Sequence, residues 1–125
     1  MAGETILIVE DNEKNMKLAR DVLRFHGFTI LEATDGETAV RLTAEHEPKL
    51  VLMDIQMPGI DGIQALERIR ADERTRRIPV VALTASVMAG DRERFDAAGF
   101  DGFIAKPIDV KAFPDQVRAA LDHHK

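Results

Sequence analysis

In the middle of the chain, residues 50–62 have the sequence LVLMDIQMPGIDG. Four apolar residues, 50–53, precede the carboxylate of Asp54, which is typical of a short strand buried on both faces of a sheet. The residues that follow include one proline, two glycines and a second aspartate, and this composition predicts a tight turn. We therefore expect a central strand with Asp54 at its carboxyl end.

Four other stretches have the pattern of short strands. Three are apolar runs that stop at a polar residue: 5–9 before Glu10, 79–83 before Thr84, and 102–105 before Lys106. Residues 28–33 are more mixed, which suits a strand near the edge of a sheet.

Amphipathic stretches lie between these runs and predict five helices. Their core-facing positions recur at helical spacing: Met16, Ala19, Val22, Leu23 and His26 before Gly27; Ala39, Leu42 and His46 between Asp35 and Pro48; Ile63, Leu66 and Ile69; the stretch 92–98 before Gly99; and Phe113, Val117 and Leu121 after Asp109. Asp35 and Asp109 are candidate N-caps, and Gly27 is a candidate C-cap. The alternation indicates an α/β domain with a doubly wound, five-stranded parallel sheet and helices on both faces.

The composition fits one domain and excludes several classes of protein. The 125 residues suit a single domain, and the absence of cysteine excludes disulfides and thiolate metal sites. A formal net charge of −5 argues against binding the phosphate backbone of nucleic acid. No apolar run approaches the roughly 20 residues of a membrane span. We expect a cytoplasmic protein with one domain, residues 1–125, and no effector domain.

Reactive side chains follow four of the predicted strands: Glu10 and Asp11 after the first, Asp54 after the third, Thr84 after the fourth, and Lys106 after the fifth. Ligands of such sheets bind beyond the carboxyl ends of the strands, so these groups converge if their strands are neighbours. Carboxylates that repel each other favour a divalent cation, and Mg²⁺ suits a shallow oxygen site. A carboxylate can also accept a phosphoryl group, whose oxygens a hydroxyl and an ammonium group would bind.

Each of these residues also has an ordinary structural role open to it. Asp54 is a candidate turn residue, Glu10 and Asp11 are candidate caps of the first helix, Thr84 can bond its own backbone, and Lys106 can be a solvated surface lysine. Their joint placement at four separate strand ends favours the phosphoryl site.

The sequence resembles the receiver domain of bacterial two-component response regulators. Four motifs within residues 5–121 carry the resemblance: ILIVEDN (6–12), LMDIQMPGIDG (52–62), VALTA (81–85) and IAKP (104–107). It implies the CheY-like, flavodoxin-like fold with strand order 2-1-3-4-5. Within the family, EDNE (10–13), NMKL (15–18) and MAGD (88–91) resemble DivK-type single-domain regulators.

The resemblance implies roles around the phosphoacceptor. Asp54 would take a phosphoryl group from a histidine kinase or a histidine phosphotransfer protein. Mg²⁺ would be bound by the Asp54 and Asp11 carboxylates, by Glu10 through water and by the backbone carbonyl of Gln56. Glu10 stands where the family often has aspartate. Gln56 and Ser86 hold positions at which the family tunes the lifetime of the phosphoryl group.

It also implies a switch. Thr84 would bond a phosphoryl oxygen, Lys106 would pair with it, and the Lys106–Pro107 peptide bond would be cis. Phe103 holds the position of the switch aromatic and would move when Thr84 is drawn inward. The face made by the fourth helix, fifth strand and fifth helix would then bind a protein partner. The protein would be a monomer, with a phosphorylation-dependent dimer left open.

Three other functions would use part of this set of residues or this fold. A haloacid-dehalogenase-like phosphatase needs a second aspartate two residues after the nucleophile, where this chain has Gln56. A flavodoxin-type binding module needs a phosphate-cradling loop after the first strand, where residues 11–13 are acidic. An adaptor of the receiver fold that is never phosphorylated stays open. We favour a phosphoacceptor signalling protein, which catalyses only its own phosphorylation and dephosphorylation.

Overall fold

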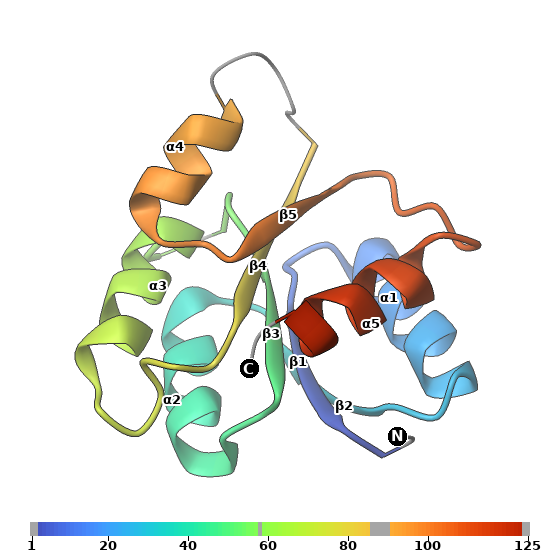
Figure 1. Ribbon diagram of the computed structural model, residues 1–125, viewed down its shortest axis with the longest axis horizontal. Coiled ribbons are helices and arrows are strands. Elements are labelled where there is room, and N and C mark those ends of the chain that lie inside the picture. Colours follow the sequence, from blue (N-terminus) through green and yellow to red (C-terminus); the bar gives the residue numbers. More distant parts are fainter. Residues whose placement is uncertain (1–2, 58, 86–90, 124–125) are drawn as a thin grey trace.

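Strands and helices alternate along the chain, as the sequence predicts. The computed structural model describes residues 3–57, 59–85 and 91–123. The elements within these ranges (Figure 1) are β1 (Thr5–Val9), α1 (Glu13–Phe25), β2 (Thr29–Ala33), α2 (Gly36–His46), β3 (Leu50–Asp54), α3 (Gly62–Ala71), β4 (Val80–Thr84), α4 (Asp91–Ala98), β5 (Gly102–Ala105) and α5 (Phe113–His123). None of the helices in the described ranges has the length and apolar character needed to cross a membrane.

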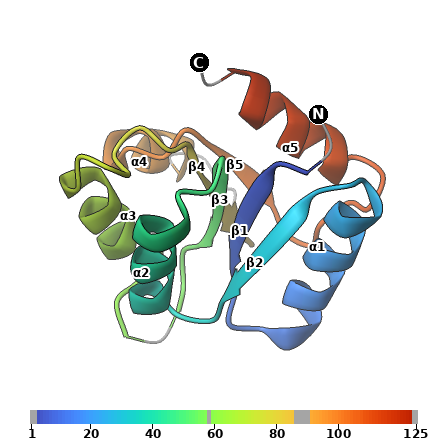
Figure 2. The ribbon, with the colours of Figure 1, turned by 90° about the horizontal axis from the view of Figure 1, so that it is seen from below.

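The strands form one parallel sheet in the order β2-β1-β3-β4-β5, which confirms the expected fold. Helices α1 and α5 cover one face of the sheet, and α2, α3 and α4 cover the other (Figure 2). The register places Asp54 opposite Leu83 and Thr84 opposite Ala105. The carboxyl ends of β3, β4 and β5 therefore lie side by side.

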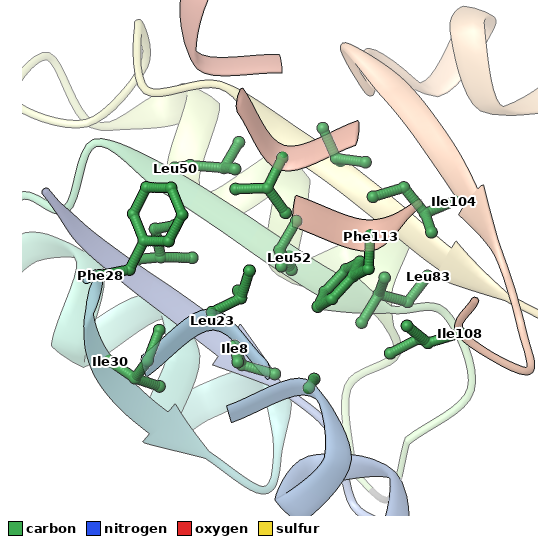
Figure 3. Close-up of a cluster of buried hydrophobic side chains, with 14 of the residues drawn as sticks. Ile8, Leu23, Phe28, Ile30, Leu50, Leu52, Leu83, Ile104, Ile108 and Phe113 are labelled. Atoms are coloured by element: carbon green, nitrogen blue, oxygen red, sulfur yellow. The ribbon is translucent and has the colours of Figure 1, made fainter. Parts of the chain in front are cut away.

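A hydrophobic core lies on each face of the sheet. Alternate residues of a strand point to opposite faces, so a strand covered on both sides is apolar throughout. In β1, Ile6 and Ile8 belong to the core shared with α1 and α5, whereas Leu7 and Val9 belong to the core shared with α2, α3 and α4. Figure 3 shows labelled members of the first core: Ile8, Leu23, Phe28, Ile30, Leu50, Leu52, Leu83, Ile104, Ile108 and Phe113.

Polar side chains begin three of the helices, where the first N–H groups have no partner within the helix. Asn12, Asp35 and Asp61 are the N-caps of α1, α2 and α3, and each side chain accepts a hydrogen bond from the N–H three residues on. The cap at Asp35 is confirmed. The alternative in which Glu10 or Asp11 caps the first helix is wrong, because Asn12 does so.

Other predicted details of the helices differ. The Asp109 carboxylate accepts hydrogen bonds from the N–H groups two and three residues on and so closes a turn, and α5 begins only after it. His26 and His46 are exposed and do not pack on the core, because each lies at the end of its helix. Gly27 follows the C-cap residue His26 with φ of 91°, a left-handed conformation that favours glycine.

Candidate functional site

A cavity of about 450 Å³ opens where β1, β3, β4 and β5 end. Its lining combines acidic, amide, hydroxyl and basic side chains: Glu10, Asp11, Asn12, Asn15, Asp54, Ile55, Gln56, Thr84, Ala85, Arg94 and Lys106. The structure thus brings together the residues that sequence analysis placed at four separate strand ends. Ser86, the other candidate for tuning phosphoryl lifetime, lies outside the described residues.

Three carboxylates of the cavity form a compact acidic cluster. One oxygen of each of Glu10, Asp11 and Asp54 lies within 4.8 Å of the others. Glu10 is 2% exposed and Asp54 is 5% exposed, whereas Asp11 is open to solvent. Buried carboxylates that share a site lose hydration and repel each other, so a bound cation would stabilise their charged forms. Oxygen donors with one solvent-facing ligand fit Mg²⁺, which keeps several of its waters.

Lys106 already supplies one positive charge to the cluster. Its Nζ donates a hydrogen bond to Glu10 Oε2 at 3.0 Å and lies 3.4 Å from Asp54 Oδ1. The N–H of Gln56 donates to Asp54 Oδ1 at 3.2 Å, and the N–H of Asn12 donates to Glu10 Oε1 at 3.1 Å. These contacts fix the orientation of both buried carboxylates before any ligand arrives.

The ionisation of Asp54 reflects this balance of charges. Burial, and then repulsion from Glu10, raise the pKa of Asp54 from 3.8 to about 6, against the opposing attraction of Lys106. Burial acts to lower the pKa of Lys106, but its hydrogen bond to Glu10 and the charge of Asp54 prevail and raise that pKa. Lys106 is thus held in its cationic form. The crowding of the carboxylates instead raises the pKa of Asp54.

The loop after Asp54 packs tightly against the end of β3. The N–H of Gly62 donates to the carbonyl of Ile55 at 2.9 Å. A Cβ atom at Gly62 would lie 2.5 Å from the carbonyl oxygen of Asp54 and 2.9 Å from the Cα of Ile55. Asp61 and Gln64 then form a capping box that begins α3. Only glycine fits at position 62, and the absence of a side chain lets the end of the loop pack directly against the backbone of Asp54.

The remaining candidates lie at the ends of β4 and β5. Thr84 is buried, and its carbonyl accepts a hydrogen bond of 2.8 Å from the N–H of Lys106. The peptide bond between Lys106 and Pro107 is cis. Phe103 does not line the acidic cavity but a second groove, of about 490 Å³, between β5 and α5. The centroid of its ring lies 6.3 Å from the ring centroid of Phe95 in α4.

Comparison with known proteins agrees with this geometry. Residues 6–118 match the family model of the response regulator receiver domain. The chain belongs to this family. The receiver-domain family consists of signalling proteins, and the match adds to the argument from Gln56 against a haloacid-dehalogenase-like phosphatase.

Individual relatives of this receiver domain sharpen the comparison. It is 42% identical to the polar-differentiation response regulator DivK of Brucella ovis over 94% of this chain and 96% of that protein. It is 36% identical, with a TM-score of 0.85 and 98% of each chain covered, to the receiver domain of a sensor histidine kinase from Pseudomonas aeruginosa, whose crystal structure has a magnesium ion coordinated in the active site cleft. The chemotaxis regulator CheY4 of Vibrio cholerae shares the fold, with a TM-score of 0.89 over 95% of this chain and 99% of that one, at 18% identity.

Sequence reasoning assigned no role to three polar or charged residues that line the cavity of this receiver domain, namely Asn12, Asn15 and Arg94. Asn12 is the N-cap of α1 and Asn15 lies in its first turn, and their position within four residues of the acidic pair could have indicated them. Arg94 lies ten residues after Thr84 on α4. No motif or strand end marks it, and only the folded chain brings it to the cavity.

Proposed function

We propose that this chain is a cytoplasmic single-domain response regulator that accepts a phosphoryl group from a phosphohistidine onto Asp54 with the aid of Mg²⁺. The observation that carries the proposal is the acidic cluster. One oxygen of each of Glu10, Asp11 and Asp54 lies within 4.8 Å of the others, and Lys106 is hydrogen-bonded to Glu10 and lies 3.4 Å from Asp54 Oδ1. The match to the receiver-domain family and the similarity to DivK support it.

The metal would be held by Asp11, by Asp54, by Glu10 through water and by the carbonyl of Gln56. When bound, Mg²⁺ would offset the negative charge of the carboxylates and of the transferring phosphoryl group. Asp11 is exposed and lines the cavity, so its carboxylate could replace a water of the hydrated metal ion without rearrangement of the sheet. The Pseudomonas aeruginosa receiver domain, which contains magnesium in its cleft, is a precedent among similar structures.

In the proposed transfer, a carboxylate oxygen of Asp54 forms a bond to phosphorus as the bond between phosphorus and the donor nitrogen breaks. The electron pair of that bond leaves with the imidazole of the donor. Lys106 lies 3.4 Å from Asp54 Oδ1 and would pair with a phosphoryl oxygen, while the Thr84 hydroxyl would donate to another. Because Asp54 is fixed by Gln56 and Lys106, the nucleophile is oriented in advance.

The output of the switch would pass through β4 and β5. Thr84 ends β4, and Phe103 lies in β5, paired through the backbone with Ala82 of β4. The ring of Phe103 contacts Phe95 of α4 and borders the groove toward α5. Movement of Thr84 toward a phosphoryl group would therefore be transmitted to the α4–β5–α5 face, where we place the downstream protein partner.

The deciding experiment is intact mass spectrometry after incubation with Mg²⁺ and acetyl phosphate. We expect a gain of one phosphoryl group that depends on Mg²⁺ and is absent in Asp54→Asn. Asp115→Asn, which changes an exposed aspartate of α5, is the matched control and should be phosphorylated normally. No gain with acetyl phosphate or a phosphorylated histidine phosphotransfer protein, together with no Mg²⁺ binding, would instead support an adaptor that is never phosphorylated.

A further inference from the structure

The acidic cavity contains a cation that no sequence motif indicates. Arg94 of α4 lines it together with Asp54, Thr84 and Lys106. It approaches from the helix that follows β4, whereas Lys106 approaches from the end of β5. The two basic side chains thus come to the cavity from different elements of the fold.

The guanidinium group of Arg94 lies beside an aromatic ring. Its Cζ lies 5.1 Å from the centroid of the Phe95 ring, a cation–π distance. Phe95 is itself 1% exposed and packs against the rings of Phe100 and Phe103, at 6.1 and 6.3 Å. A planar guanidinium supported by a buried ring loses less conformational entropy when it binds an anion.

The cavity contains more carboxylates than basic groups. Among the described lining residues, three carboxylates face two cations, and the Nζ of Lys106 is already bonded to Glu10 and close to Asp54. A phosphoryl group brings further negative charge into the same space. A guanidinium offers paired N–H donors that match the geometry of phosphoryl oxygens, which an ammonium group does not.

We infer that Arg94 is a second phosphoryl-binding residue, which contacts non-bridging oxygens of the incoming and transferred group from the α4 side. The inference rests on the proposed function and deepens it. In the transfer from acetyl phosphate, the bond between phosphorus and the acetyl oxygen breaks, acetate leaves with the electron pair, and the bond from Asp54 to phosphorus forms. Arg94 takes up and releases no proton in this step, because its guanidinium stays charged. Arg94 stabilises the negative charge of the phosphoryl group that the donor supplies.

The test compares Arg94→Ala and Arg94→Gln with the unchanged protein. Arg94→Gln keeps a polar hydrogen-bond donor on an alkyl chain and removes the charge. We expect both variants to be phosphorylated by acetyl phosphate about two- to fivefold more slowly, which is the range of a charged contact made by an exposed side chain. Beryllofluoride, an unreactive mimic of a phosphoryl group, should bind both variants more weakly by a similar factor in an NMR titration with Mg²⁺. Arg94→Lys should recover part of each loss.

Arg68→Ala is the matched control, because Arg68 is an exposed arginine of α3 that does not line the cavity. It should leave both measurements unchanged. Arg94→Ala and Arg94→Gln could instead lower only the melting temperature and leave the phosphorylation rate and the beryllofluoride affinity unchanged. Arg94 would then only stabilise α4, and the inference would be wrong. If the unchanged protein neither gains a phosphoryl group nor binds beryllofluoride, the proposed function fails, and the inference with it.

Discussion

At the scale of single residues, the site contains carboxylates whose burial and mutual repulsion oppose folding. Glu10 and Asp54 are nearly inaccessible to water, and their mutual repulsion is only partly offset by Lys106. Such an arrangement is costly for folding and useful for binding, because each added cation or anion finds partners already oriented. The raised pKa of Asp54 is the measurable sign of this cost.

We expect Asp54→Asn to stabilise the metal-free protein at neutral pH. The pKa of Asp54 is about 6 in the folded state against 3.8 in its ordinary form, so the folded chain binds the extra proton between about pH 4 and pH 6. Stability therefore falls as the pH rises through this window, and the variant escapes the fall. About 1–3 kcal/mol should separate the two proteins at pH 7 and almost nothing at pH 4.

Urea unfolding followed by circular dichroism, with a chelator present, measures this difference. Asp115→Asn is the control and should stay within about 0.5 kcal/mol of the unchanged protein at both pH values. An Asp54→Asn variant that is less stable than the unchanged protein at pH 7 would show that the contact with Lys106 outweighs burial and repulsion.

At the scale of elements, the loop between β3 and α3 determines how closely the chain returns to Asp54. Its constraint is steric: the position of Gly62 is bounded by backbone atoms, which cannot rotate away as a side chain can. Gly102 provides the opposite case, since a Cβ atom there would have no neighbour within 4 Å. The two glycines therefore separate the effect of crowding from the general effect of replacing glycine.

We expect Gly62→Ala to destabilise the protein by about 1–3 kcal/mol, the usual cost of forcing an atom into a packed site. The added methyl group would also push the loop away from β3, so phosphorylation by acetyl phosphate should slow as well. Gly102→Ala should change neither the unfolding midpoint nor the rate appreciably. Equal effects of the two substitutions would mean that the close packing at Gly62 is not what holds the loop.

At the scale of the whole molecule, the sequence predicts the elements better than their arrangement. The continuous apolar runs of β1, β3 and β4 follow directly from burial on both faces of the sheet. The strand order does not follow from periodicity, since it depends on which strands pair, and it came from the family resemblance. Arg94 could not be predicted because its place in the site results from how α4 packs on the sheet. The start of α5 was missed because the turn at Asp109 has the same capping chemistry as a helix.

The two ends of the chain are joined by a contact that spans nearly its whole length. Arg118 of α5 donates two hydrogen bonds, of 2.6 and 3.0 Å, to the carboxylate of Glu4, which lies just before β1, and its guanidinium lies 5.1 Å from the centroid of the Phe28 ring. Arg118 thereby ties the last helix to the first strands. The hydrogen bonds from Arg118 lower the pKa of Glu4 below 4.5, so the contact stabilises the protein above that pH and weakens as the carboxylate is protonated.

We expect Arg118→Lys to lower the free energy of unfolding at pH 7 by about 0.5–1 kcal/mol, because lysine keeps the charge but loses the paired donors and the stacking on Phe28. Arg118→Met should cost slightly more, and the difference between each variant and the unchanged protein should shrink below about pH 4 as Glu4 takes up its proton. Phosphorylation of Asp54 should be unaffected, since Arg118 does not line the acidic cavity. A loss that is independent of pH would assign the effect to packing on Phe28 and not to the pair with Glu4, and hydrogen exchange of α5 in the two variants would locate it.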